Sequence, residues 1–170
     1  MDIEEVKQNC NNKEYMIKAV KENGKLLEYA SPELQDDKEV VLEALKQDGE
    51  NLEFASLRLK DDKDVIKLGV ENAPWTICYA SERLKADREV VFESCKKYGQ
   101  ALYFASKELR ADREVVKAAI ENKGIIIKYA SGKLQDDKEL ALIAVKQNKQ
   151  AYHFISENLK QDEDIEALMG

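Results

Sequence analysis

The chain has 170 residues, of which 34 are acidic and 27 basic, and its net charge is −7. Hydrophobic residues make up 44%, which is enough to form a core and argues against a disordered chain. No apolar run approaches the roughly 20 residues of a membrane span, and residues 1–20 hold no signal-peptide core. Three widely spaced cysteines without a CxxC pattern (Cys10, Cys78 and Cys95) predict free thiols in a cytoplasmic protein. The single histidine, His153, argues against a zinc site or a histidine-dependent triad.

One motif recurs along the chain every 25 residues. It consists of an aromatic residue followed by Ala-Ser, a leucine three residues later, and an aspartate three residues after that. The copies begin at Tyr29, Phe54, Tyr79, Phe104, Tyr129 and Phe154, and Ile155 replaces the alanine in the last one. Such a period predicts a single helical-repeat domain. Its parts are a cap at 1–11, repeats at 12–36, 37–61, 62–86, 87–111, 112–136 and 137–161, and a terminal cap at 162–170.

In chain order, the first expected element is a short capping helix, because Ile3, Val6 and Cys10 share one helical face. Each repeat then opens with an aspartate, a basic and an acidic residue, and two apolar residues, as in 37–41. Apolar positions at i, i+1, i+4 and i+5 form one helical stripe, and the aspartate is a good N-cap. Glycines follow these helices, and we expect them to end each helix with a positive φ: Gly24, Gly49, Gly99 and Gly124.

A shorter second helix is expected in each repeat, with Leu52, Phe54 and Ala55 pointing inward in the second copy. Ser56 either ends this helix or caps the turn after it. One repeat cannot bury its own apolar stripe, so neighbouring repeats must stack. The predicted fold is all-α, an α-solenoid of six 25-residue two-helix repeats with short terminal caps.

With its columns aligned, the motif reads AS-x-x-L-x-x-D-[KR]-[ED]-V-V-x-x-A-[VIL]-x-x-[ND]-G-x-x-L-x-[YF]. It resembles the short helical repeat known as domain of unknown function 4116, over residues 12–162. The resemblance implies a helical solenoid and offers no catalytic or cofactor-binding residue, because that family has no assigned activity. Pro74, Ile155 and Glu163 depart from the motif, which puts only local geometry in question.

The repeated polar columns predict structure rather than chemistry. One aspartate per repeat, about 10 Å from the next, is too widely spaced to chelate a metal or to form a catalytic pair, so we expect N-caps and no metal or cofactor. A nucleophile would not be needed six times, so the repeated serines are expected to be structural and the protein not an enzyme. The basic column could follow a phosphate backbone, but an acid follows each member, which favours a solvated ladder and no nucleic-acid binding. Its members are Lys13, Lys38, Lys63, Arg88, Arg113 and Lys138.

Columns that vary between repeats are free to provide specificity. Large apolar groups fill these columns in the middle repeats, and we predict that they form a protein-binding surface: Trp75, Phe92, Tyr98, Tyr103, Ile125 and Ile126. The alternative is that Trp75 and Phe92 only fill gaps between repeats. Cys95 occupies an apolar column and is expected to pack in the core, whereas the column of Cys78 suggests exposure.

Two functions follow from these patterns. The first is a non-enzymatic scaffold that binds another protein through the variable columns. The second is a small acidic inhibitor that blocks the basic groove of a nucleic-acid-handling enzyme, because residues 1–75 hold 18 acidic and 11 basic residues. That acidic half can equally serve solubility alone.

Overall fold

The computed structural model describes residues 1–170, and its secondary structure consists of α-helices and 3-10 helices. The helices group into two compact units, unit 1 (Met1–Leu84) and unit 2 (Lys85–Gly170). None of the helices has the length and apolar character that crossing a membrane requires.

Unit 1 contains the first elements of the chain. They are α1 (Ile3–Gln8), α2 (Lys13–Glu22), η1 (Gly24–Tyr29), α3 (Pro32–Gln35), α4 (Lys38–Gln47), η2 (Gly49–Phe54), η3 (Leu59–Asp61), α5 (Lys63–Asn72), η4 (Pro74–Tyr79) and α6 (Glu82–Lys85), whose last residue opens unit 2. Of the three residues that predicted the capping helix α1, only Val6 is fully buried.

Unit 2 repeats the same order of elements. They are α7 (Arg88–Lys97), η5 (Gly99–Tyr103), η6 (Leu109–Ala111), α8 (Arg113–Asn122), η7 (Gly124–Tyr129), α9 (Gly132–Gln135), α10 (Lys138–Gln147), η8 (Lys149–Phe154), α11 (Glu157–Lys160) and α12 (Glu163–Met169). The second helix of each repeat is therefore a 3-10 helix, and a short connecting helix or turn leads to the next repeat.

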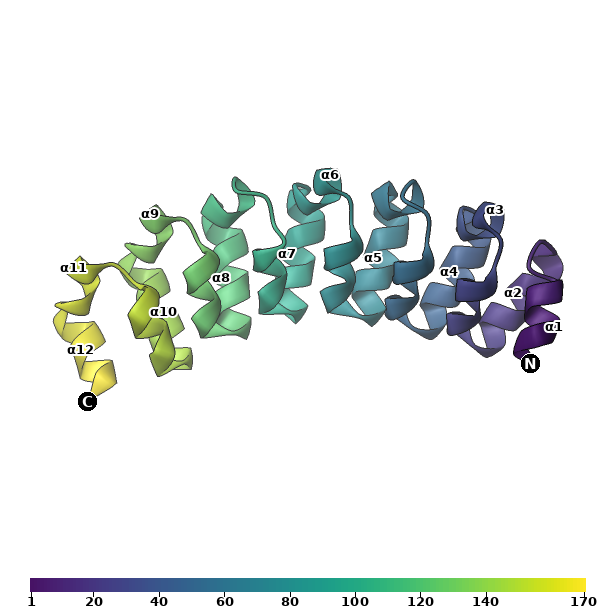
Figure 1. Cartoon of the computed structure of the whole chain (residues 1–170). Coiled ribbons are helices and arrows are strands. Elements are labelled where there is room, and N and C mark those ends of the chain that lie inside the picture. Colours follow the sequence, from purple (N-terminus) through teal and green to yellow (C-terminus); the bar gives the residue numbers. More distant parts are fainter. The chain divides into compact units, whose positions relative to one another are not determined.

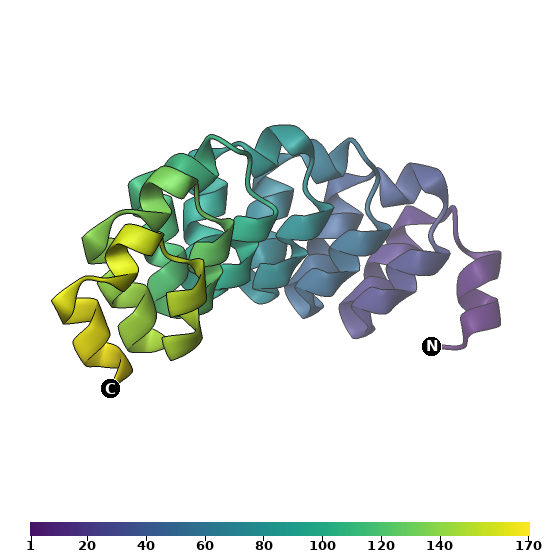
Figure 2. The ribbon, with the colours of Figure 1, turned by 60° about the vertical axis from the view of Figure 1, so that its left-hand side comes forward.

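Each unit has two layers. In unit 2 the α-helices α7, α8, α10 and α12 pack one on the next, and the 3-10 helices η5, η7 and η8 do the same (Figure 1). In unit 1, α2, α4 and α5 form the α layer, and η1, η2 and η4 form the η layer. The stacking of α8 on α10 is also visible in the turned view of Figure 2. The predicted fold class, an all-α α-solenoid, is confirmed.

The core lies between the two layers. In α8 the stripe Val115, Val116, Ala119 and Ile120 is completely buried, at the predicted i, i+1, i+4 and i+5 spacing. In the η layer, Leu102 on η5 and Ile127 on η7 are also completely buried, and both of these helices pack against α8. Phe54, predicted to point inward, is only half-buried.

The aspartates that open the repeats are N-caps, as predicted. The Asp112 carboxylate accepts hydrogen bonds from the backbone N–H groups of Glu114 and Val115 at 3.0 and 3.1 Å. These bonds satisfy two of the donors that a helix start leaves without partners. Asn12 does the same for α2.

The glycines between the two helices of each repeat do not have positive φ, so the predicted reason for them is wrong. They are required by close packing. A Cβ on Gly99 would lie 2.4 Å from the carbonyl oxygen of Ala119 in the next α-helix, and one on Gly124 would lie 2.3 Å from that of Ala144. Only a residue without a side chain lets the η layer approach the next repeat this closely.

The repeated serines cap the connecting segments, which resolves the two roles left open for Ser56. Its hydroxyl accepts a hydrogen bond from the Leu59 N–H at 3.2 Å and donates one to the carboxylate of Asp36 in the preceding repeat. Ser131 departs from this pattern, because Ala111 takes the place of the aspartate and its hydroxyl has no partner.

Candidate functional site

The basic column forms bridges between repeats rather than a free row of charges. Arg88 Nε lies 2.7 Å from the N-cap carboxylate of Asp112, one repeat further on. Arg113 pairs in the same way with Asp137 at 3.0 Å and Glu139 at 2.5 Å. The acid that neutralises each of these two bases thus belongs mainly to the following repeat, not to the adjacent position in the sequence.

The remaining bridges repeat this geometry. Lys138 lies 2.8 Å from Asp162 and 2.7 Å from Asp164 in unit 2, and Lys38 makes the equivalent pairs with Asp62 and Asp64 in unit 1. Lys13 pairs with Asp37 at 2.7 Å. We call these bridges the charge ladder. Because their charges are neutralised by carboxylates, these bases are poorly suited to bind phosphates.

The charge ladder shifts the pKa values of its members. The hydrogen bond from Arg88 holds the pKa of Asp112 below its usual value, against the opposing effect of burial. The hydrogen bonds that Arg113 donates to Asp137 and Glu139 raise its pKa. These aspartates therefore serve both as a cap and as an ion-pair partner. The structure contains no group of three or more His, Cys, Asp or Glu side chains that could hold a metal ion.

The predicted protein-binding residues of unit 2 do not form one surface. Phe92 lies in the α layer on α7, with Arg88 Cζ 5.8 Å and Lys96 Nζ 5.7 Å from its ring centre. Tyr103 ends η5 in the η layer and is 56% exposed. Trp75 lies on η4 in unit 1 and is 44% exposed, so it is not merely a gap-filling residue.

Two further predicted residues behave differently from Tyr103. Ile126 is 2% exposed and belongs to the core, so the prediction that it lies on a binding surface is wrong. In a 3-10 helix, side chains three residues apart lie on the same line. This period puts Ile125 and Lys128 on the outer side of η7 and turns Ile126 inward. Tyr98 is half-buried at the start of η5, where three other repeats have an Asn or Asp that caps the 3-10 helix.

The structure does bring an aromatic cluster together in the η layer of unit 2. The ring of Tyr103 lies 5.1 Å from that of Phe104, edge-on, and 5.0 Å from that of Tyr129 in the next repeat. The Lys128 ammonium lies 4.8 Å from the ring centre of Tyr129 and 5.9 Å from that of Phe154. We call the set Tyr103, Phe104, Ile125, Lys128, Tyr129 and Phe154 the η surface.

The η surface was only partly accessible to sequence reasoning. Repetition of the aromatic column (Phe104, Tyr129 and Phe154) suggests a purely structural role, yet Phe154 is 37% exposed and the other two rings are half-buried. Lys128 was not singled out at all. The signal that could have found it is the three-residue period of a 3-10 helix, which aligns position 128 with Ile125.

Other structural residues were also missed. Asn122 accepts a hydrogen bond from the Gly99 N–H at 2.8 Å and donates to the carbonyls of Lys96 and Lys97, so it joins two repeats. Gln135 donates to the carbonyls of Ile127 and Lys128 and closes the end of η7. The hydrogen-bond partners of Asn122 and Gln135 lie in other segments of the fold, so the sequence positions of these two residues do not reveal them.

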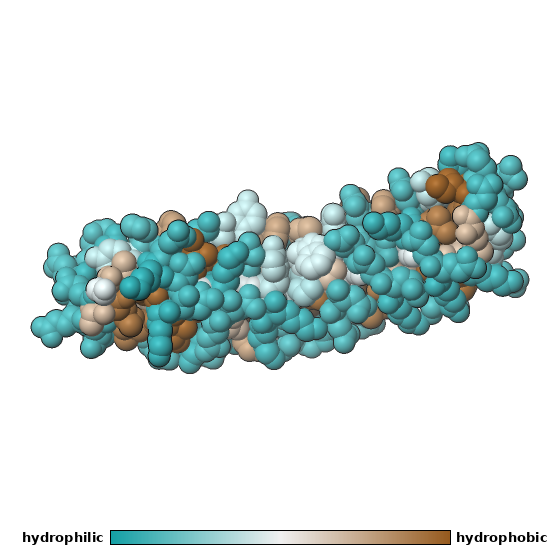
Figure 3. Space-filling model, turned by 90° about the horizontal axis from the view of Figure 1, so that it is seen from below, coloured by the Kyte–Doolittle hydropathy of each residue, from teal (hydrophilic) through white to brown (hydrophobic).

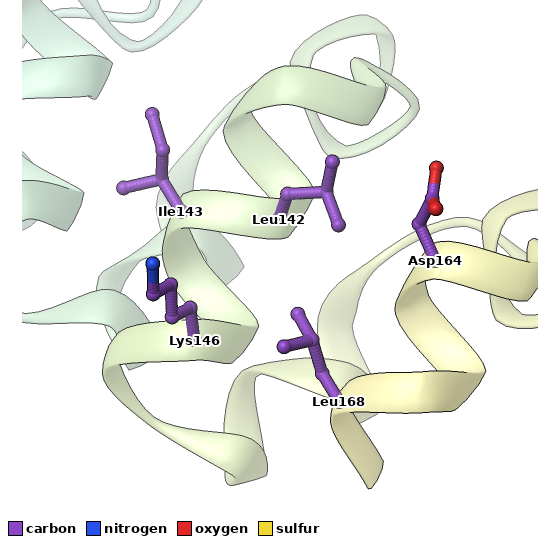
Figure 4. Close-up of a pocket in the computed structure, with 5 residues that line it drawn as sticks. All are labelled: Leu142, Ile143, Lys146, Asp164 and Leu168. Atoms are coloured by element: carbon purple, nitrogen blue, oxygen red, sulfur yellow. The ribbon is translucent and has the colours of Figure 1, made fainter.

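An apolar cleft of about 320 Å³ lies between α10 and α12. Leu142 and Ile143 on α10 and Leu168 on α12 line it, with Lys146 and Asp164 at its edge (Figure 4). In the space-filling view, which is mostly hydrophilic, hydrophobic residues reach the surface toward the C-terminal end of the chain (Figure 3). The cleft is open to solvent and holds no convergent set of polar groups.

Cys95 is unsuited to nucleophilic chemistry. Cys95 is completely buried, as expected for its column, and burial raises its pKa to about 12. Cys10 and Cys78 are half-buried, and none of the three cysteines forms a disulfide. A thiol with a raised pKa is protonated and inert at neutral pH.

Comparison with models of known protein families assigns the chain to one family. The model of the family described as domain of unknown function (DUF4116) matches residues 12–60, 62–110 and 112–165, which together cover most of the chain. The chain belongs to this family, and each match spans about two of the 25-residue periods. Neither a curated protein nor a solved structure matches the chain.

Proposed function

We propose that this protein is a non-enzymatic helical-repeat scaffold that binds another protein through the η surface of unit 2. The observation that carries the proposal is the exposure of Tyr103, at 56%, within a cluster of rings held in contact with one another. Large aromatic side chains provide a disproportionate share of the binding energy of protein interfaces.

The η surface is built to bind without large rearrangement. Tyr103 follows directly on Leu102, and Tyr129 lies two residues after Ile127, and both of these aliphatic residues are completely buried. The rings are therefore fixed to the core by their own short helices. A surface whose side chains are already ordered loses less conformational entropy when a partner binds.

The proposal gives the repeated polar residues no catalytic role. The serine and aspartate columns act as helix caps and bridges, and Cys95 is buried. Free thiols also suit a reducing compartment, so we place the protein in the cytoplasm as part of the same proposal.

The test is affinity capture from the cell that produces the protein. The variant Tyr103→Ser/Phe154→Ser should lose the protein captured by the wild type, while Phe92→Ser, an aromatic residue of the α layer, should retain it. All three proteins should have the same circular dichroism spectrum and melting temperature. Retention of the captured protein by the Tyr103→Ser/Phe154→Ser variant would overturn the proposal.

A second function, the acidic inhibitor of a nucleic-acid-handling enzyme, is favoured by the distribution of charge. Unit 1 holds 19 acidic and 12 basic residues, whereas unit 2 holds 15 of each, so the entire net charge of −7 lies in unit 1. A partner bound in this way should be released by moderate salt and should be lost when Glu50 and Glu53 are changed to Gln. Binding that is insensitive to salt excludes this function.

A further inference from the structure

The η surface has a charge as well as a shape. The helices η5, η7 and η8 contain no Asp or Glu, while they contain Lys128, Lys149 and His153. In unit 1, the helices η1 and η2 hold Glu28, Glu50 and Glu53 beside Lys25, and η4 holds no charged residue. The η layer of unit 1 thus carries three acids beside one lysine, whereas the η layer of unit 2 carries bases and no acid.

The charge ladder explains how unit 2 is neutral and still has a basic face. Its bases and acids pair along the α layer, as in Arg88–Asp112, Arg113–Glu139 and Lys138–Asp164. The acids of the unit are in large part held there, away from the η layer. Lys128 forms no ion pair, and its ammonium instead lies over the rings of Tyr129 and Phe154.

From this arrangement we infer that the partner of the η surface is an acidic protein segment, with Asp or Glu side chains next to apolar ones. The inference rests on the proposed function and specifies the partner's chemistry. A carboxylate from the partner would pair with the Lys128 ammonium, which the two rings already hold in place. The apolar side chains beside it would pack on Tyr103, Phe104 and Ile125.

The same features favour a protein segment over a nucleic acid. A single strand needs a row of bases that follows its phosphates in addition to aromatic rings for stacking. Here the regular row of bases is the charge ladder, and its members pair with carboxylates. Lys128 places one ammonium over the rings of Tyr129 and Phe154, a pattern that suits one or two carboxylates on an apolar segment.

The experiment measures binding of a fluorescein-labelled peptide of alternating Glu and apolar residues (Leu and Tyr) to the full chain by fluorescence polarisation. The same peptide with Lys in place of Glu, and labelled oligo(dT), are the comparison probes. We expect the acidic peptide to bind most tightly of the three probes, and we expect its affinity to fall as the salt concentration increases. Equal binding of the two peptides, no binding of either, or tighter binding of oligo(dT) overturns the inference.

Two variants locate the effect. Lys128→Glu should weaken binding of the acidic peptide by about tenfold or more, which corresponds to roughly 1.4 kcal/mol. Lys146→Glu, which makes the same charge change in the α layer, should leave binding unchanged. Equal effects of the two variants overturn the inference, because net charge alone then explains binding.

The outcome is separable from that of the proposed function. If the cellular partner is lost with Tyr103→Ser/Phe154→Ser but retained by Lys128→Glu, the scaffold function stands and the acidic-partner inference fails. If neither variant releases the partner, both fail.

Discussion

The double role of the ladder aspartates can be separated at Asp112. Asp112→Asn keeps a side-chain oxygen that caps α8 but removes the charge that pairs with Arg88. Asp112→Ala removes both. Leu102→Ala, at a completely buried position of η5, is the matched core substitution in the same unit.

The expected magnitudes follow from the surroundings of each residue. Asn caps a helix about as well as Asp, so Asp112→Asn should lose only the ion pair, which at a surface is about 0–1 kcal/mol because the Arg88 side chain is 55% exposed. Asp112→Ala should lower the free energy of unfolding by about 1–2 kcal/mol, because it removes the N-cap as well as the ion pair. Leu102→Ala should lose about 2–5 kcal/mol, because it leaves a cavity.

The assay is urea unfolding followed by circular dichroism at low and at high salt. High salt should remove most of the difference between the wild type and Asp112→Asn, and should leave the difference between Asp112→Asn and Asp112→Ala, because only the ion pair is screened. If Asp112→Asn is as damaging as Asp112→Ala at high salt, the capping role assigned to Asp112 is wrong. If Asp112→Ala matches Leu102→Ala, the distinction between cap and core fails.

Three further predictions follow from other contacts. Gly99→Ala should destabilise the protein by about 1–3 kcal/mol, since its Cβ would meet the Ala119 carbonyl, whereas Gly132→Ala, with nothing within 4 Å, should be neutral or slightly stabilising; thermal melts compare them. The pKa values of Asp112, Asp137 and Asp162 are lowered in the folded state, so the stability they provide is present above their unfolded pKa, near about 3.9, and is lost as the pH falls through their folded values. The melting temperature should therefore fall below about pH 4, and less steeply in Asp112→Asn; equal slopes contradict the assignment. Cys95, with its pKa of about 12, should react with a thiol reagent only in denaturant, while reaction in the native protein would show that it is not in the core.

The repeating features of this fold could be predicted from the sequence because a period specifies them. The Asp caps, the leucine and alanine columns, and the stripe of α8 all follow from spacing alone. The partner of each ladder base could not be predicted in this way. Arg88 is adjacent in sequence to Glu89, yet it also reaches Asp112, because stacking brings the start of one helix next to the start of the following one.

The candidate surface was harder to predict than the fold, and the errors have physical causes. Variation between repeats does not by itself mean exposure, because the column of Ile126 also holds Asn51, Thr76 and Ala101, and all four are buried. That column varies in size because it fills a space of changing volume. The separation of Phe92 from Tyr103 depends on which layer each helix joins, and this follows from the tertiary packing.

The charge ladder has a consequence for how the repeats unfold. Each bridge joins the base of one repeat to the cap of the next, so melting one repeat also removes a charge that supports its neighbour. In a linear array, such nearest-neighbour coupling decides whether repeats unfold together or one by one. Here part of the coupling is ionic while the cores are apolar. The ionic strength of the solution thus adjusts the cooperativity within each unit while the packing that stabilises each repeat stays the same.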